Sequence, residues 1–98
     1  MTKEEAENKA GEYLRTVVRL PEGDEIVVIR DATLVKKYGY IVFYDSKMYL
    51  ETESIQHALA GNGPVVVENR GGITMLGSAN SSEVEIAEYE RNKRAIPL

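Results

Sequence analysis

Apolar residues recur at helical spacing along residues 2–18, while polar residues occupy the other faces. The apolar stripe consists of Ala6, Ala10, Tyr13, Leu14, Val17 and Val18. Because residues three or four apart lie on one face of a helix, this pattern predicts an amphipathic helix. Thr2 and Glu5 have the spacing of a capping box at its start, and Pro21 and Gly23 follow as stop signals.

Four later segments are rich in β-branched or aromatic residues, and we predict strands over residues 25–36, 40–44, 65–67 and 73–76. The first is interrupted at Arg30 and Asp31, which indicates a bulge or a bend. Gly39 supplies a turn between the first two strands, and residues 69–72 supply one between the last two. Asp45 and Ser46 are expected to end the second strand, after which residues 47–50 continue in extended form.

Two further helices are predicted. A short one over residues 55–59 is capped by Thr52 or Ser54. A longer one over residues 82–94 has acidic residues first and basic residues last, which complements the helix dipole. The order α-β-β-α-β-β-α predicts an α+β fold, in which a four-stranded, mostly antiparallel sheet is packed by the long N-terminal helix and accompanied by the short middle helix and a C-terminal helix.

The chain of 98 residues fits a single domain over residues 1–98. Its net charge of −4 argues against a nucleic-acid partner, whose phosphates need a basic surface. The same charge suits a basic protein partner, or serves only solubility. A charged N-terminus and the lack of a long apolar run argue against a signal peptide and a membrane span, so we expect a cytoplasmic protein that does not bind membranes.

Residues that could carry chemistry are few. The chain has no cysteine, and its single histidine, His57, has no companion motif for a zinc site or a catalytic triad. Asp45, Glu51 and Glu53 form a loose acidic cluster, which solvated loop charge and helix capping also explain. We therefore predict no catalytic residue, no metal ligand and no cofactor.

Several short motifs then occur in an order that resembles a known family. They are Gly39, YLET at residues 49–52, LAGNGP at residues 59–64, Gly77 and EYE at residues 88–90. Together they resemble the immunity protein 35 family, also called the YrhB domain family, over about the last two thirds of the chain. Tyr40 stands where relatives often have tryptophan, and Glu53 and Ser54 stand where they often have glycine and aspartate.

The resemblance implies a non-enzymatic bacterial immunity protein that binds and neutralises a cognate toxin, and papain-like peptidases or deamidases are among the implied toxins. Under this hypothesis we expect loops at one end of the sheet, with Lys37, Tyr38, Asn62 and Gly63, to contact the partner. Tyr38 is the aromatic residue that we expect at a hairpin tip. The chain itself is expected to be a monomer or a weak dimer.

Two alternatives stay open at this point. A chaperone-like or housekeeping protein would have no dedicated toxin partner, and a small hydrolase would use Asp45 and Glu51 of the acidic cluster. Suppression of client aggregation would favour the first alternative. Loss of a detected turnover on substitution of the two carboxylates would favour the second.

Overall fold

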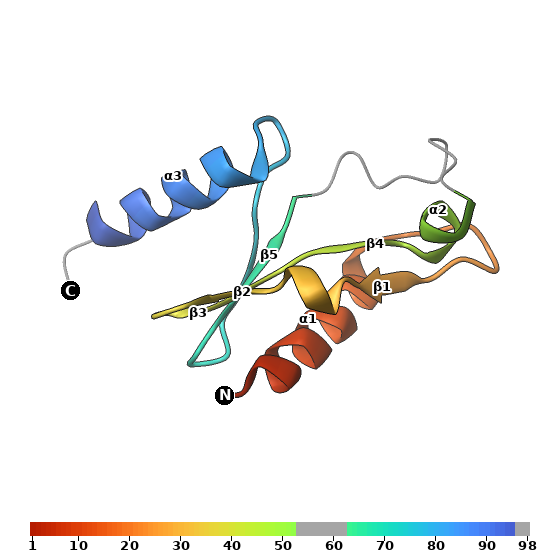
Figure 1. The fold of residues 1–98 in the computed structure, drawn as a ribbon, viewed down its shortest axis with the longest axis horizontal. Helices are drawn as coiled ribbons and strands as arrows, with labels where there is room; N and C mark the ends of the chain where they lie inside the picture. Colours follow the sequence, from red (N-terminus) through yellow and green to blue (C-terminus); the bar gives the residue numbers. More distant parts are fainter. Residues whose placement is uncertain (53–62, 96–98) are drawn as a thin grey trace.

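The computed structural model describes residues 1–52 and 63–95 (Figure 1). In chain order the elements are α1 (Lys3–Val17), β1 (Ile26–Val28), the 3₁₀ turn η1 (Arg30–Ala32), β2 (Leu34–Lys36), β3 (Gly39–Val42), β4 (Tyr44–Ser46), α2 (Lys47–Thr52), β5 (Val65–Glu68), β6 (Ile73–Met75) and α3 (Ser82–Ala95). The predicted α+β class, with a helix at either end of the sequence, is confirmed. The short helix predicted over residues 55–59 lies outside the described residues.

Helix α1 begins as its sequence predicts. The Glu5 amide donates to the Thr2 hydroxyl and the Thr2 amide donates to the Glu5 carboxylate, both at 3.1 Å, which completes the capping box. Ala6, Ala10 and Leu14 are fully buried on the face that meets the sheet. Val17 is 47% exposed at the end of the helix, so its predicted place in the buried stripe is wrong.

The segment predicted as one strand over residues 25–36 forms two strands. β1 pairs with β4 and β2 pairs with β3, both antiparallel, and Val27 lies opposite Asp45 whereas Val35 lies opposite Tyr40. Between these two pairs the chain advances by eight residues from Val27 to Val35, but by only five from Tyr40 to Asp45. The difference of three residues equals the length of η1, which bulges out of the pairing. The interruption predicted at Arg30 and Asp31 is real, but it is large enough to divide the hairpin between a two-stranded and a four-stranded sheet.

A buried carboxylate on α1 accounts for the position of this interruption. Glu7 is only 4% exposed. Its Oε1 accepts a hydrogen bond from Arg30 Nη1 at 3.0 Å, and its Oε2 accepts one from the Thr33 hydroxyl. Arg30 Nη2 also donates to Asn8 Oδ1 at 3.0 Å. Because a buried charge is costly unless it is paired and hydrogen-bonded, these contacts hold η1 against α1.

The four-stranded sheet has the order β2-β3-β5-β6 and is antiparallel throughout. Side chains alternate across it. Val42, Val65 and Val67 pack under α1, with Tyr40 at the margin. Ile41, Val66 and Leu76 pack on the opposite face with Ile86 of α3. Figure 1 shows the two helices on opposite sides of the strands.

The prediction for residues 45–50 is wrong. Asp45 and Ser46 do not end a strand but pair with β1 as part of β4, and residues 47–50 lie in α2 rather than in an extended segment. The Ser46 hydroxyl accepts from the Tyr49 amide, and Asp24 Oδ1 accepts from the Met48 amide, both at 3.0 Å. These two bonds cap the N-terminus of α2. One of the two acceptors, Asp24, is 24 residues from Met48 in the sequence, so the local pattern alone could not reveal the helix.

The two predicted hairpins, β2–β3 and β5–β6, are confirmed. Their packing relies on a glycine at the start of β3. Gly39 has a φ of 154°, and a Cβ atom there would lie 2.1 Å from the Val67 carbonyl oxygen of β5. Any other residue must push the two strands apart or leave this backbone region.

We predict that Gly39→Ala lowers the free energy of unfolding by more than about 1 kcal/mol, because the added methyl group meets backbone that cannot move aside. The measurement is the midpoint of urea unfolding. Gly72→Ala is the matched control, since a Cβ atom at Gly72 meets nothing within 4 Å. Equal losses in the two variants would show that the close approach at Gly39 has no energetic weight.

Candidate functional site

The turns of the two hairpins lie against each other at one end of the sheet. The Asn69 amide donates to the Tyr38 carbonyl at 2.8 Å, and Asn69 Nδ2 donates to the Lys37 carbonyl at 2.9 Å. The side chain and backbone of one residue thus join the β2–β3 turn to the β5–β6 turn. We call the surface formed by Lys37, Tyr38, Asn69, Arg70 and Lys93 the hairpin-tip surface.

Helix α3 is attached to this surface by tyrosines and carboxylates. The Tyr38 hydroxyl donates to Glu90 Oε2 at 2.9 Å, and the Tyr89 hydroxyl donates to Glu68 Oε1 at 2.6 Å. The two rings lie 5.6 Å apart between centroids and are tilted by 54°. Each tyrosine therefore reaches from one layer of the fold to a carboxylate in the other.

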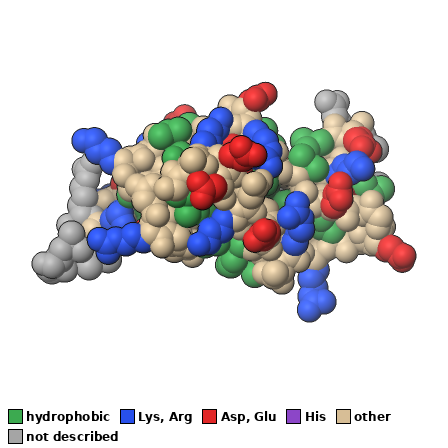
Figure 2. Space-filling view, turned by 90° about the horizontal axis from the view of Figure 1, so that it is seen from below, with side chains coloured by type: hydrophobic (Ala, Val, Ile, Leu, Met, Phe, Trp, Pro, Cys, Tyr) green, Lys and Arg blue, Asp and Glu red, His purple; other side chains and the backbone are tan. Residues whose placement is uncertain are grey.

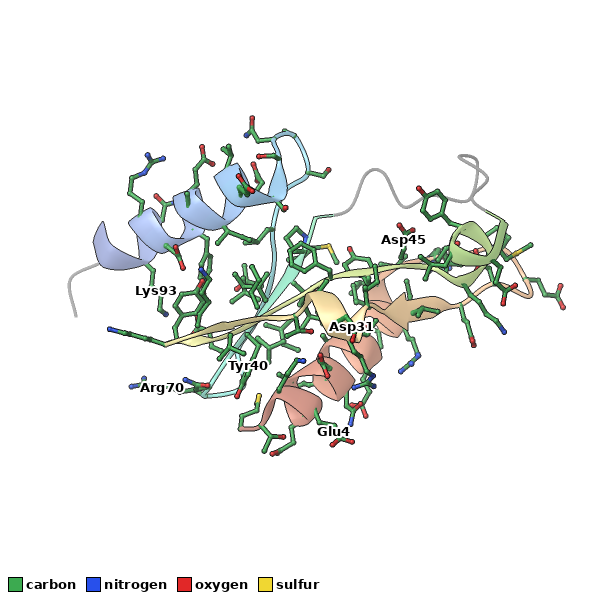
Figure 3. All side chains as sticks on the ribbon, viewed as in Figure 1. Glu4, Asp31, Tyr40, Asp45, Arg70 and Lys93 are labelled. Atoms are coloured by element: carbon green, nitrogen blue, oxygen red, sulfur yellow. The ribbon has the colours of Figure 1, made fainter. Side chains whose placement is uncertain are left out.

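Basic side chains complete the attachment. Lys93 Nζ lies 3.3 Å from Glu68 Oε1 and 5.6 Å from the centroid of the Tyr38 ring. Lys36 Nζ lies 3.5 Å from Glu90 Oε2. Figure 3 shows Lys93 pointing from α3 toward the strands, with Arg70 at the tip of the β5–β6 turn. The contacts fix the angle at which α3 meets the sheet.

These contacts shift the acidity of the groups that make them. Hydrogen bonds from Tyr89 and then Lys93 lower the pKa of Glu68, although its partial burial opposes the change. Burial, followed by the hydrogen bond to a carboxylate, raises the pKa of both Tyr38 and Tyr89 well above the ordinary value. At neutral pH the Tyr89–Glu68 pair therefore consists of a neutral hydroxyl bound to a charged carboxylate.

The hairpin-tip surface has a local charge opposite to that of the whole chain. Lys37 and Arg70 are exposed, and neither side chain forms a hydrogen bond or a close ion pair with another described residue. Lys9, Lys36 and Lys93 lie beside them, as the contacts above and the approach of Lys9 Nζ to Gly71 show. In Figure 2 Lys and Arg side chains lie at the left end, where the hairpin tips lie, and others are spread along the rest of this face.

Of the four residues predicted to contact a partner, the three that the structure describes do not lie at one end of the sheet. Lys37 and Tyr38 precede β3, whereas Gly63 precedes β5 on the antiparallel neighbour, so they lie at opposite ends of the strand pair, roughly 20 Å apart along the strand direction. Lys37 is exposed and Tyr38 is half-buried against α3. Asn62 lies outside the described residues.

Gly63 has a structural reason to be glycine. A Cβ atom there would lie 2.2 Å from the Gly77 carbonyl oxygen. The residue borders an open pocket of about 210 Å³, and the described residues that line the pocket include no carboxylate, lysine or arginine. They are Phe43, Tyr44, Gly63, Pro64, Gly77, Ser78, Asn80 and Ser82.

Sequence reasoning missed Asn69, Arg70 and Lys93. The stretch from Asn69 to Gly72 was visible as a hairpin loop, but nothing local placed it beside Lys37. That neighbourhood follows from the pairing of β3 with β5, which are separated by more than twenty residues. The helix position of Lys93 likewise acquires its role only when α3 folds back over the sheet.

Two members of the loose acidic cluster, Asp45 and Glu51, lie among the described residues. Asp45 lies in β4, where its Oδ1 accepts from the Ser46 amide at 2.8 Å. Glu51 is exposed and lies 4.0 Å from Lys47 Nζ. Glu53 and His57 are outside the described residues. Among residues 1–52 and 63–95, no three histidine, aspartate or glutamate side chains gather in a way that could hold a metal ion.

Tyr44 is a contrasting tyrosine. Its ring is buried under α1, and its hydroxyl has no hydrogen-bond partner in the described structure. Burial, with a smaller contribution from the Asp45 charge, raises the pKa of Tyr44 to about 12. Tyr44 and Tyr89 thus provide a contrast between a buried hydroxyl without a partner and a half-buried hydroxyl bound to a carboxylate.

We predict that Tyr89→Phe destabilises the protein by about 1.5–3 kcal/mol at neutral pH, because the charged Glu68 carboxylate loses the hydrogen bond that the Tyr89 hydroxyl donates to it. Tyr44→Phe, which removes a hydroxyl without a partner, is expected to be neutral or to stabilise by up to about 1 kcal/mol. Chemical denaturation at pH 7 measures both. Equal effects in the two variants would contradict the role assigned to the Tyr89–Glu68 bond.

The cost of Tyr89→Phe should also depend on pH. A carboxyl whose pKa is lowered on folding contributes stability above its unfolded pKa of about 4.3, and this contribution is lost as the pH falls through the folded value. The difference between wild type and Tyr89→Phe is therefore expected to shrink below about pH 4. Urea unfolding at pH 3 and pH 7 measures it, and a difference that does not change with pH would overturn the assignment.

Comparison with known proteins places the chain in a family. No helix in residues 1–52 and 63–95 has the length and apolar character needed to span a membrane. No curated protein and no solved structure matches the chain. The family model of immunity protein 35 matches residues 4–92, nearly the whole sequence. The chain belongs to the immunity protein 35 family.

Proposed function

We propose that this protein is a cytoplasmic immunity protein that binds and neutralises a cognate toxin without catalysis of its own, and that the hairpin-tip surface contacts the toxin. Family membership supports the class of function. The observation that carries the proposal for the surface is that Lys37 and Arg70 are exposed on two turns joined by Asn69, and that neither side chain forms a close ion pair with another described residue. Two such cations can pair with carboxylates of a partner at no cost to the protein's own contacts.

The hairpin-tip surface is also held in place by internal contacts, which supports its role in binding. Asn69 joins the two turns, and the tyrosine contacts of α3 brace them from behind. A contact surface that is ordered before binding loses less conformational entropy when the partner arrives. Tyr38 adds a half-buried ring beside the cations, and tyrosine is enriched among residues that dominate binding energy.

The partner surface expected from this arrangement is acidic, although the net charge of the chain is negative. An immunity protein acts by covering an active site or a substrate groove, and the resemblance implies a toxin with papain-like peptidase or deamidase activity. A role for Asn62 and Gly63 stays a prediction for a second contact region, and Gly63 lies at the other end of the strand pair. Gly63 itself is a poor position to mutate, because its backbone is packed.

We predict that the double charge reversal Lys37→Glu with Arg70→Glu weakens binding to the toxin encoded by the neighbouring gene by at least about tenfold, mainly through slower association at low salt. Co-expression rescue and isothermal titration of the purified pair measure the effect. Arg19→Glu is the matched control, since Arg19 is exposed in the loop after α1, away from the hairpin tips.

Equal binding by the double variant and wild type would remove the hairpin-tip surface from the proposal. A complete lack of binding and rescue by wild type would overturn the immunity function itself. If wild type instead suppressed aggregation of unrelated clients without a specific partner, the chaperone-like alternative would replace it.

A further inference from the structure

The basic side chains around the hairpin tips fall into two groups, and the first group is already paired. Lys36 Nζ lies 3.5 Å from Glu90 Oε2, and Lys93 Nζ lies 3.3 Å from Glu68 Oε1. Both pairs join a strand to α3, so these two cations belong to the side of the sheet that α3 covers. A carboxylate of a partner would have to compete with Glu68 or Glu90 for them.

Lys9 belongs to the second group. It lies on α1 and is half-buried. Its Nζ approaches the β5–β6 turn so closely that a Cβ atom on Gly71 would lie 2.7 Å from it. Lys9 forms no hydrogen bond or close ion pair with another described residue. A partly desolvated ammonium without an acceptor gains more from an incoming carboxylate than a fully solvated one does.

The acidic neighbours of Lys9 on α1 do not supply this acceptor. Glu5 lies one turn before Lys9, and its carboxylate accepts the Thr2 amide of the capping box at 3.1 Å. Glu12 lies one turn after Lys9 and forms no close ion pair with another described residue. The charge of Lys9 is therefore left unpaired within the described part of the chain.

Lys9 stands next to the two unpaired cations of the hairpin-tip surface. Gly71 directly follows Arg70 in the β5–β6 turn, and Asn69 ties that turn to Lys37. Figure 1 shows this turn near the N-terminal end of α1, and Figure 3 places Arg70 at its tip. Lys9, Arg70 and Lys37 therefore form a set of unpaired cations that extends from α1 onto both turns.

The uniform sign of this set decides what can cover it. A closed dimer of two copies places a surface patch against the same patch of the other copy. Such a dimer would bring two sets of unpaired cations together, and like charges across an interface repel. Contact of these cations with acidic residues elsewhere on a second copy is head-to-tail, and it produces rings or open filaments rather than a dimer. The charges therefore favour a different protein with an acidic surface.

We propose that Lys9 is a further contact residue, and that an acidic side chain of the partner binds between Lys9 and Arg70 on the side of the hairpin tips that faces α1. The two oxygens of a carboxylate accept from an ammonium and a guanidinium at the same time. The proposal rests on the proposed function and deepens it, because it adds a residue outside the hairpin-tip surface and defines the side from which the partner approaches. Lys36 and Lys93, whose charges are balanced, make only a minor contribution.

The first experiment needs only the full chain and a peptide probe. A capped oligoglutamate peptide is titrated into protein labelled with ¹⁵N and ¹³C, with a capped oligolysine peptide as control. We expect oligoglutamate to shift the Gly71 amide and the Lys9 Cε signals, and Lys9→Gln to remove the shift at Gly71. Equal effects of both peptides, no shift at Gly71 and Lys9, or shifts confined to Lys36 and Lys93 would overturn the proposal.

The second experiment measures binding of the toxin of the neighbouring gene to Lys9→Gln and Arg15→Gln. Each variant removes one positive charge from α1, but Arg15 lies beside β1 rather than at the β5–β6 turn. We expect Lys9→Gln to weaken binding by at least about fivefold and Arg15→Gln by less than about twofold. The urea midpoint should be the same in both variants, because neither side chain bonds to another described residue. Equal losses of binding would contradict a local role for Lys9.

A double-mutant cycle tests whether Lys9 and Arg70 share one carboxylate. The loss of binding in the Lys9→Gln, Arg70→Gln double variant is expected to be smaller than the product of the two single losses, because residues that share a contact are not independent. A double loss equal to that product would show that the two cations bind separate groups, and it would overturn the shared site.

The two proposals fail in different ways. Unchanged binding by Lys9→Gln, with binding lost in the Lys37 and Arg70 charge reversal, would remove Lys9 from the contact and leave the immunity function in place. No toxin binding by wild type would overturn the immunity function, and the peptide titration would then decide the carboxylate site alone. Salt-sensitive self-association of wild type in sedimentation that Lys9→Gln abolishes would show that the site serves a second copy, which also overturns the proposal.

Discussion

The ion pair between Glu7 and Arg30 is the interaction on which the layout of this fold depends. It buries a carboxylate of α1 and ties it to the turn that interrupts the long hairpin. Without that turn, β1 and β2 would form one continuous strand beside β3 and β4. With it, the register changes by three residues and the hairpin divides between two sheets. β2 thereby becomes a short edge strand of the four-stranded sheet.

The face of the sheet opposite α1 is organised differently. Ile86, Ile41, Val66 and Leu76 form a small apolar cluster there, and two tyrosine–carboxylate hydrogen bonds join α3 to the strands beside it. The two tyrosines connect the layers through carboxylates, so α3 is positioned by directional bonds more than by apolar area. Directional bonds define an angle, whereas apolar burial alone is non-directional. This explains how a modest core can still hold the hairpin tips in one arrangement.

Net charge is a poor guide to the charge of the hairpin-tip surface. The chain is acidic as a whole, yet its hairpin-tip surface is basic because the carboxylates nearest to it, Glu68 and Glu90, are occupied by tyrosines and lysines. Lys37 and Arg70 are left to face solvent. An expectation drawn from the total charge points to a basic partner, while the local arrangement favours an acidic one.

Local sequence determined the elements whose causes are local. The capping box and the apolar stripe specify α1, the turn residues specify both hairpins, and the order of charges specifies α3, because each of these signals acts within a few residues of the structure that it stabilises. The tertiary structure alone decided the rest. The division of the first hairpin needs Glu7 to reach Arg30, α2 needs Asp24 as a distant cap, and the hairpin-tip surface needs β3 beside β5. These contacts join residues far apart in the chain, and their energies depend on burial and on partners that no local pattern contains.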